Sequence, residues 1–437
     1  MAAVAPISTY YWGIAVLVVG SLDTLLSNNA NNRAAKWAAY YVGMEVLLRM
    51  TGSNIFWEAG KYGTIILLLV GLLSERLTRP WPKKYFFFFL LLLPSLAVIN
   101  FPDFDVAREE VSFNLSGPFL LTLSSIYFYN RSLSGLEVQA ILRNVLLPCL
   151  TMLIYLVIST PSIEEIEFGT QSNFQASGGF GPNQVSTVIG LAVFCIVIGI
   201  YFRTYLINSM VVDVLILAVF VVRGLITFSR GGMIGAVIGS IILVGYSVFA
   251  SKRSSILAST LIFLMIAGGT GLAVWDYVNN QTKGRLEFRY SGKNFRTGTQ
   301  KDITSGRTDI MLTELNFFYD NPVFGIGPGM GTLLVENNAG NPAHSHSEYT
   351  RLLAEHGIFG VIALLILLIT PLIRIFKLPP SYRALPLAIF AFVLFTLVHS
   401  AMRLAIPGFF YGLCLITNVP GKRLSSKKTI QKVSEKV

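Results

Sequence analysis

The sequence predicts an all-α polytopic membrane protein, with about twelve transmembrane helices and one large loop on the outer side. Hydrophobic residues make up 53% of the 437 residues and charged residues only 13%, about half the charge content of a soluble globular domain. Apolar runs suited to a hydrocarbon core of roughly 30 Å recur along the whole chain. The basic loops between these runs fall on one side. We therefore expect a single integral membrane domain over 1–437.

Twelve apolar runs are predicted to span the membrane. They cover residues 9–27, 62–75, 84–100, 114–130, 140–159, 183–202, 207–225, 231–250, 255–275, 357–375, 383–400 and 403–419. A further stretch, 34–50, carries Lys36, Glu45 and Arg49. Because each charge costs roughly 2.5 to 3.5 kcal/mol at the centre of a membrane, we expect this stretch to be interfacial or re-entrant. If it crosses instead, the chain has thirteen spans and its N-terminus lies outside.

The first run and the cysteines have simple interpretations. The run from about Tyr10 to Leu26 follows no basic segment and shows no small-residue cleavage pattern, which indicates a retained span rather than a signal peptide. Cys149, Cys195 and Cys414 all fall inside apolar runs, so we expect them to be packing residues.

The distribution of charge predicts the orientation. Segment 76–84 and the basic tail 420–437 fall on one side with the other Arg- and Lys-bearing loops, and this side is expected to be cytoplasmic. The acidic loops 101–110 and 159–168 and the long insertion 276–345 then face outward. The net charge of +11 is explained by this topology and does not require nucleic acid as a partner.

The start of the insertion is strongly basic. Its cations outnumber Asp276 and Glu287 between residues 276 and 301; they are Lys283, Arg285, Arg289, Lys293, Arg296 and Lys301. Such a segment forms either a solvated surface that contacts anionic lipid or a binding surface for an anionic ligand. Under the second interpretation, Arg289 and Arg296 are candidate substrate contacts.

Two arginines stand at predicted helix starts. Arg307 follows Ser305, a candidate cap, in the first turn of a helix that Asn321 and Pro322 end. A cation there opposes the helix dipole, so Arg307 is either an ordinary surface arginine or one held for a ligand. Arg230 begins a span at its outer edge, where it either snorkels or holds an anion. We favour the anion, because the following glycines, Gly231 and Gly232, leave room beside the guanidinium.

The segment NPVFGIGPGMGT contains four glycines, at 325, 327, 329 and 331. It lacks the GK[ST] of a P-loop and the strand-turn-helix setting of a dinucleotide site. We therefore expect the glycines to serve tight turns.

The segment AHSHSEYTRLLAEHGIFG is the most informative one, although a lone histidine at a helix start is more often structural than catalytic. Ser345 and Glu348 are spaced as a capping box, which would place His346 at the first helical position, where the dipole keeps the imidazole neutral and able to accept a proton. His344 and His346 form an H-x-H pair, but no third ligand lies close in sequence, so we predict no metal site.

Several of these segments together resemble the bacterial O-antigen ligase and polymerase superfamily. The resemblance lies mainly in the C-terminal half and includes GGFGPNQVSTVIGL at 178–191, TFSRGGMIGAVIG at 227–239, SGR at 305–307, NPVFGIGPG at 321–329 and AHSHSEYTRLLAEHGIFG at 343–360. The order and spacing of the segments match too. Each motif is loose by itself, whereas the set is specific.

The resemblance implies a membrane glycosyltransferase of GT-C-like helical fold that uses a polyprenyl-diphosphate-linked glycan at the periplasmic face of the bacterial inner membrane. His346, Ser347, Gly357 and Gly360 fit the pattern H-[NSQ]-x9-G-x-x-G, whose histidine activates the acceptor hydroxyl. The usual Asn is replaced here by Ser347. By motif, Arg230 and Arg307 look like the diphosphate ligands. His344 has no secure counterpart and is a further candidate substrate contact. No cofactor is expected, and the reaction would be metal-independent and inverting.

The sequence leaves the acceptor open. A polymerase would extend another lipid-linked repeat unit and a ligase would modify lipid A core or a protein; the polymerase is favoured, with a chain-length regulator as a candidate partner. A lipid-linked glycan flippase is a more remote alternative, because it would be expected to carry charges at the bilayer midplane.

Overall fold

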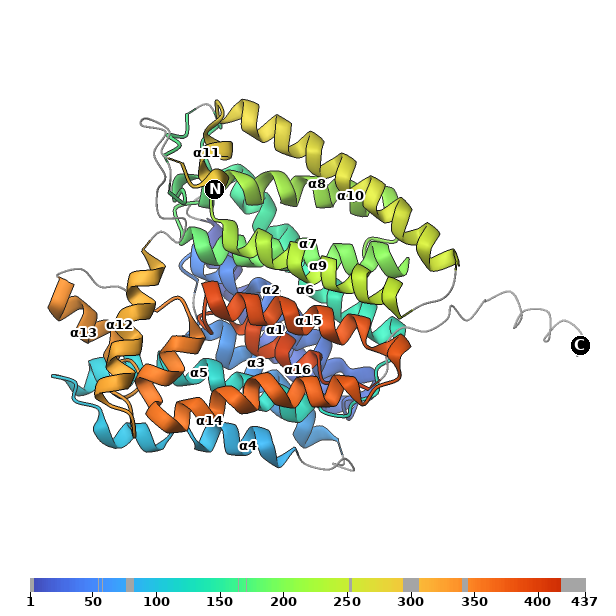
Figure 1. The fold of residues 1–437 in the computed structure, drawn as a ribbon. Coiled ribbons are helices and arrows are strands. Elements are labelled where there is room, and N and C mark those ends of the chain that lie inside the picture. Colours follow the sequence, from blue (N-terminus) through green and yellow to red (C-terminus); the bar gives the residue numbers. More distant parts are fainter. Residues whose placement is uncertain are drawn as a thin grey trace, which may run out of the picture.

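The prediction of an all-α fold is confirmed. The computed structural model is described for residues 4–53, 55–56, 58–75, 82–163, 165–169, 171–250, 254–293, 306–339 and 345–417. Within these ranges the regular secondary structure is helical, and the helices pack side by side as a bundle (Figure 1). Their bounds are α1 Val4–Leu26, α2 Arg33–Met50, α3 Ala59–Ser74, α4 Lys83–Leu90, α5 Phe104–Phe128, α6 Gly135–Ser159, α7 Pro182–Phe202, α8 Met210–Ile226, α9 Arg230–Phe249, α10 Ser254–Gln281, α11 Arg285–Ser291, α12 Arg307–Asp320, α13 Met330–Ala339, α14 Glu348–Phe376, α15 Ala384–His399 and α16 Ala405–Leu413, with short 3-10 turns η1 Ala30–Asn32, η2 Pro94–Val98, η3 Gln175–Ser177 and η4 Pro380–Tyr382.

The helices fit a polytopic membrane protein. Six of those in the described part of the chain are long and apolar enough to cross a membrane by length and composition alone: α1, α5, α6, α7, α9 and α14. The helices α3 and α15 are apolar but shorter. Each of the twelve predicted spans overlaps a helix, while the number of crossings stays a prediction.

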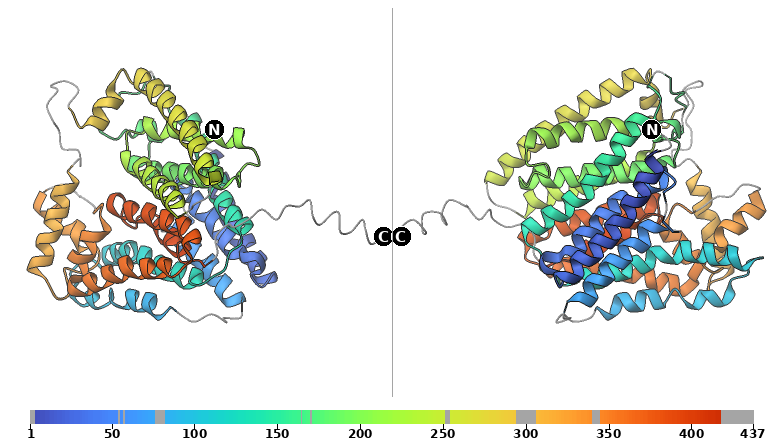
Figure 2. Two further views of the ribbon diagram at one scale, coloured as in Figure 1. Left: turned by 45° about the vertical axis from the view of Figure 1, so that its right-hand side comes forward. Right: turned by 180° about the vertical axis from the view of Figure 1, so that it is seen from behind.

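The expected interfacial position of residues 34–50 is wrong. They form α2, which runs antiparallel to α1: the Thr9 and Thr51 hydroxyls are 2.9 Å apart at one end, and Trp37 Nε1 donates to Asp23 at 2.9 Å toward the other. Gly43 of α2 packs so closely on α6 that a Cβ there would lie 2.4 Å from the Val145 carbonyl oxygen. The two N-terminal helices lie side by side in Figure 2. The helix is therefore part of the bundle interior.

Ion pairs explain why α2 can be buried despite its charges. Arg49 Nη2 lies 2.8 Å from Glu45 Oε1 and 3.0 Å from Glu58 Oε2, and Lys61 Nζ lies 2.8 Å from the same Glu58 oxygen. A charge costs much less in the interior when it is paired and hydrogen-bonded. Whether α2 crosses the membrane, and with it the choice between twelve spans and thirteen spans, stays a prediction.

The segment 178–191 includes the first half of α7, which packs against the start of α9 and holds it in place. Gly190 of α7 and Gly232 of α9 allow the two helices to touch, since a Cβ on Gly232 would lie 1.8 Å from the Ser186 carbonyl oxygen. Ser186 Oγ also donates to the Ser229 carbonyl at 2.7 Å. Small residues at such crossings are typical of helix packing in membranes. This contact fixes the position of the residue that follows Ser229, which is Arg230.

The close crossing predicts a position-specific stability effect within α9. Gly232→Ala should lower the melting temperature of the detergent-solubilised protein, because overpacking costs roughly 1 to 3 kcal/mol. Gly245→Ala, in the same helix but with nothing within 4 Å of a built Cβ, should leave it unchanged or raise it slightly. Equal melting temperatures for the two variants would contradict the packing.

Candidate functional site

Three arginines from separate elements gather at one end of the bundle. Arg230 is the first residue of α9, Arg307 the first of α12, and Arg289 lies in α11. Arg230 Nη1 donates to the Arg289 carbonyl at 3.0 Å, and Arg289 Nε donates to the Phe228 carbonyl at 2.9 Å. The predicted first-turn positions of Arg230 and Arg307 are thus confirmed. We call Arg230, Arg289 and Arg307 the arginine cluster.

Electrostatics shows that the members of the arginine cluster repel one another. Burial, followed by the charges of Arg230 and Arg307, lowers the pKa of Arg289 to about 10. Burial and then the charge of Arg230 lower the pKa of Arg307. An anion bound among the three guanidinium groups would offset both the desolvation and the repulsion.

The glycines after Arg230 do not leave the open space that we expected. A Cβ on Gly231 would lie 2.1 Å from His399 Cδ2, so the His399 ring fills that side. The ring belongs to the last residue of α15, whose carbonyl accepts a hydrogen bond from Asn183 Nδ2 at 2.8 Å. Gly231 and Gly232 therefore allow α7, α9 and α15 to pack closely and hold Arg230 in place.

The predicted capping box at His346 is wrong. The helix α14 begins at Glu348, and its N-cap residue Ser347 makes no side-chain cap. The carboxylate of Glu348 points elsewhere: Oε1 accepts from Arg351 Nη2 at 2.5 Å and Oε2 from the Met402 amide at 3.0 Å. His346 lies two residues before the helix, half-buried, with its Nδ1 atom buried. His346 is therefore not in the first turn of a helix, and the predicted effect of the helix dipole on its imidazole no longer has a structural basis.

The glycines of the two C-terminal motifs form one structural unit. Gly357 breaks α14 with φ 56° and ψ −135°, a conformation that only glycine adopts easily. The segment before α13 pairs with the break: Ile326 N donates to the Ala354 carbonyl at 2.9 Å, Gly327 N to the Glu355 carbonyl at 3.0 Å, and Ile358 N to the Pro322 carbonyl at 2.8 Å. Positive φ at Gly325, Gly327 and Gly329 confirms the predicted tight turns at these three positions, whereas the prediction is wrong for Gly331, which lies in α13. The turns serve to lock the break in α14.

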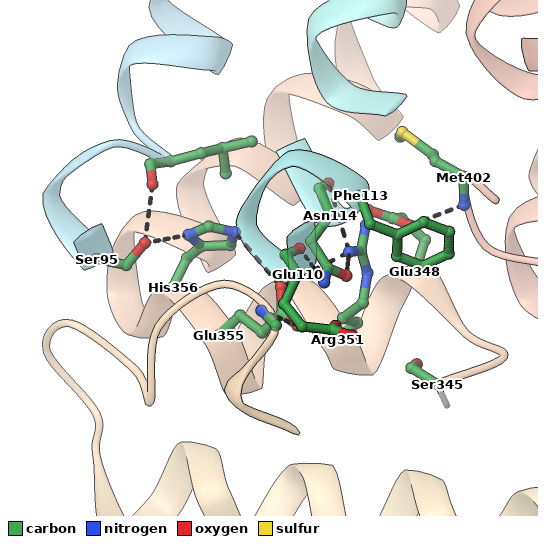
Figure 3. A network of polar contacts seen from close by, with 12 residues as sticks. Ser95, Glu110, Phe113, Asn114, Ser345, Glu348, Arg351, Glu355, His356 and Met402 are labelled. Atoms are coloured by element: carbon green, nitrogen blue, oxygen red, sulfur yellow. Dashed lines mark hydrogen bonds and ion pairs between the residues drawn. The ribbon is translucent and has the colours of Figure 1, made fainter. Parts of the chain in front are cut away.

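A buried polar network that the sequence analysis missed lies beside this unit (Figure 3). Arg351 Nη1 donates to the side-chain oxygen of Asn114 and lies 3.6 Å from Glu355 Oε2. Ser95 Oγ and His356 Nδ1 are 2.6 Å apart on the other side of Glu355. The available signal was the spacing of Glu348, Arg351 and Glu355, because charges three and four apart in an apolar helix must face one another or a polar site.

Arg403 connects this network to the arginine cluster. It donates to the carbonyl of Ser345, the residue before His346. Arg351 and Arg307 lie close enough for their charges to act on the Arg403 guanidinium group. Glu314 of α12 accepts a hydrogen bond from Thr350 at 2.5 Å, and its pKa is raised by burial despite hydrogen bonds from Ser345 and Thr350. The residues around Ser345 thus fix the backbone that carries His346, and Arg403 lies between this backbone and the charge of Arg307.

The structure therefore brings together Arg230, Arg289 and Arg307 and links them to His346 through Ser345 and Arg403. His344, Arg296 and Ser305 lie outside the described residues, as does the basic tail. Within the described residues no group of three or more His, Cys, Asp and Glu side chains could hold a metal. The absence of a metal in the reaction stays a prediction.

The fold and this site define a multi-pass membrane protein with a cluster of arginines and a histidine-bearing segment at one end of its helix bundle. Residues 214–365 match the family model described as O-antigen ligase. The matched residues include Arg230, Arg289, Arg307 and His346, and the match confirms the resemblance to the O-antigen ligase and polymerase superfamily. No curated protein matches the chain.

The break in α14 predicts a sharp difference between two glycines of the same region. Gly357→Ala should lower the melting temperature substantially, because its backbone is unfavourable for alanine and a Cβ there would lie 2.5 Å from the Val323 carbonyl oxygen. Gly331→Ala is the control, since its Cβ would meet Ile326 Cδ1 at an ordinary 3.9 Å. Scanning fluorimetry of both variants checks this; an unaffected Gly357→Ala protein would refute the locked break.

Proposed function

We propose that the protein is a glycosyltransferase of the bacterial inner membrane that moves a glycan from a polyprenyl (undecaprenyl) diphosphate to an acceptor hydroxyl at the periplasmic face. The observation that carries the proposal is the convergence of Arg230, Arg289 and Arg307, which Arg403 links to the His346 segment. The family match covers all four residues. Repelling guanidinium groups beside a histidine suit the displacement of an anionic leaving group.

The arginine cluster would hold the diphosphate of the donor. Guanidinium groups bind phosphate oxygens bidentately, and charge-assisted hydrogen bonds of this kind are about twice as strong as neutral ones. Arg230 and Arg307 are the principal ligands in this proposal. Arg289 is tied to both by charge and to Arg230 by its carbonyl, so it is a third candidate ligand. Three cations can neutralise a diphosphate without a metal.

His346 would act as the general base. The acceptor O–H proton passes to an imidazole nitrogen while the acceptor oxygen bonds to C1 of the donor sugar. The bond from C1 to the diphosphate oxygen breaks, and its electron pair leaves with the diphosphate. Attack from the face opposite the leaving group inverts the configuration at C1. The half-buried position of His346 keeps it within reach of a substrate.

The favoured reaction is polymerisation of lipid-linked repeat units. The acceptor is then the glycan of a second polyprenyl-linked molecule, and a chain-length regulator is a candidate partner. The basic residues at the start of the insertion suit two diphosphate-bearing substrates. Transfer to lipid A core by a ligase is the alternative, and the two reactions use the same site.

Two variants should separate chemistry from donor binding. His346→Ala should abolish transfer by purified protein but keep the affinity for undecaprenyl diphosphate. Arg307→Gln should weaken that binding by roughly ten- to a hundredfold, because a hydrogen bond to a charged group contributes about 1.5 to 3 kcal/mol. Native mass spectrometry in lipid nanodiscs measures binding, and chromatography of labelled glycan measures transfer.

The matched control is Arg108→Gln, which removes an exposed arginine from α5. It should leave transfer and binding unchanged. Normal transfer by His346→Ala would refute the assigned base, and equal binding by Arg307→Gln and Arg108→Gln would refute the assigned diphosphate ligand.

A reconstituted assay decides the acceptor. Purified protein is incubated with the lipid-linked repeat unit isolated from the source bacterium and with no other acceptor. A polymerase gives a ladder of longer glycans on electrophoresis. Product that forms only after lipid A core is added would show a ligase instead.

A further inference from the structure

A polar cleft of about 470 Å³ lies in the loop that joins α6 to α7. Residues 167, 169 and 171–175 line it, and we call it the loop cleft. Its volume falls in the range of roughly 300 to 1,000 Å³ that is typical of small-molecule sites. The family match begins at residue 214 and the proposed reaction uses none of the lining residues, so neither assigns a role to the loop cleft.

Asn173 ties the loop together. Its Nδ2 donates to the Glu167 carbonyl at 3.0 Å, and its Oδ1 accepts from the Ala176 amide at 2.9 Å. The Asn173 carbonyl accepts from Ser177 Oγ at 2.7 Å. One buried amide side chain therefore connects the two ends of the lining segment and fixes the shape of the loop cleft.

The polar side chains that line the loop cleft are uncharged except for one carboxylate. They are Gln171, Ser172, Asn173, Gln175 and Glu167. The side chains of Glu167, Gln171 and Gln175 are exposed and form no hydrogen bond with the part of the chain that the structure describes. A primary amide both donates and accepts hydrogen bonds, as a sugar hydroxyl does. None of the described lining residues is a cation, so the lining suits a neutral polar ligand and not a second diphosphate.

An exposed aromatic ring completes the lining. Phe174 is 62% exposed, whereas Phe168 of the same loop is buried and stacks on Phe228. The face of an aromatic ring carries partial negative charge and attracts the C–H groups on the flat side of a sugar ring. Hydrogen-bonding amides beside an exposed ring are therefore the features of a glycan-binding cleft.

Two contacts join the loop cleft to the arginine cluster. The Asn173 amide donates to the Thr227 carbonyl at 2.9 Å. The rings of Phe168 and Phe228 stack with their centres 4.9 Å apart, and the Phe228 carbonyl accepts the hydrogen bond from Arg289 Nε. Thr227 and Phe228 lie just before α9, whose first residue belongs to the arginine cluster. The loop cleft is thus attached to the backbone that positions two of the three arginines.

A donor held at the arginine cluster by its diphosphate must extend its glycan over the neighbouring surface. We propose that the loop cleft binds the glycan of the lipid-linked donor, with one sugar ring stacked on Phe174 and its hydroxyl groups hydrogen-bonded to Gln171 and Gln175. This binding mode rests on the proposed glycosyl transfer. The arginine cluster then recognises the diphosphate, and the loop cleft recognises the sugars.

Contacts in the loop cleft would distinguish the donor from the lipid product. Undecaprenyl diphosphate that remains after transfer has lost its glycan and with it every contact in the loop cleft. Specificity is a difference between two affinities, and here the donor would bind more tightly than the spent lipid. This difference would favour the exchange of spent lipid for a new donor after each transfer.

Three variants test the loop cleft. Phe174→Ala removes the ring, and Phe174→Trp keeps an aromatic face. Phe104→Ala is the matched control, because Phe104 is a 78% exposed phenylalanine at the start of α5. The probes are the lipid-linked repeat unit isolated from the source bacterium and undecaprenyl diphosphate. Native mass spectrometry in lipid nanodiscs gives both Kd values, and only the repeat unit that excess undecaprenyl diphosphate displaces is counted as bound at the donor site.

We expect Phe174→Ala to raise the Kd for the repeat unit by roughly two- to tenfold, the effect of one aromatic contact, and to leave the Kd for undecaprenyl diphosphate unchanged. Phe174→Trp and Phe104→Ala should both bind the repeat unit like the wild-type protein. An unchanged Kd for the repeat unit in Phe174→Ala, the result expected if the ring contacts a partner protein, would overturn the assignment. An equal loss for both probes would also overturn it, because the ring would then only support the arginine cluster. Failure of the wild-type protein to bind undecaprenyl diphosphate would instead overturn the proposed function.

Discussion

The pairing between the broken turn of α14 and the loop at 321–329 supports the rest of the site. A helix break at the edge of a membrane leaves backbone carbonyls without partners, and each unsatisfied group costs several kcal/mol away from water. Here the amides of Ile326 and Gly327 satisfy the carbonyls of Ala354 and Glu355. The same loop delivers the Gly329 amide to the Glu355 carboxylate. One set of hydrogen bonds therefore fixes the apolar part of α14, its charged first turns and the position of α12.

The second constraint is the buried charge network at the same end of the bundle. Glu45 Oε2 accepts from the Ala405 amide at 2.7 Å, and Arg49 Nη2 donates to the Arg403 carbonyl at 3.3 Å. The interior position of α2 therefore holds the segment that presents Arg403 to Ser345. Removal of one member of a buried pair leaves an uncompensated charge, which costs roughly 3 to 5 kcal/mol. The charges of α2 are thus part of the support of the site and not of its chemistry.

The sequence predicted the features that depend on local pattern. Apolar runs located the helices, and Arg230 and Arg307 stand at helix starts as expected. The predictions that failed concern residues whose hydrogen-bond or charge partners lie far away in the sequence. Glu348 looked like half of a capping box, but its carboxylate is bound by Arg351 and by the Met402 amide, 54 residues away. The sequence analysis assigned no role to Arg403, because its neighbours Arg307 and Arg351 come from other helices.

The electrostatic repulsion within the arginine cluster also suggests how the cluster would help the proposed reaction. Two cations at helix starts oppose the helix dipoles, and the three guanidinium groups repel one another, so the charges of the cluster are electrostatically unfavourable by themselves. In the proposed reaction, a donor diphosphate would relieve this repulsion on binding. As the bond to C1 breaks, the negative charge on the diphosphate would increase, and the same guanidinium groups would bind it more strongly. The repulsion among Arg230, Arg289 and Arg307 would therefore favour the transition state over the bound donor, because the cluster is most nearly neutralised when the leaving group carries its full charge.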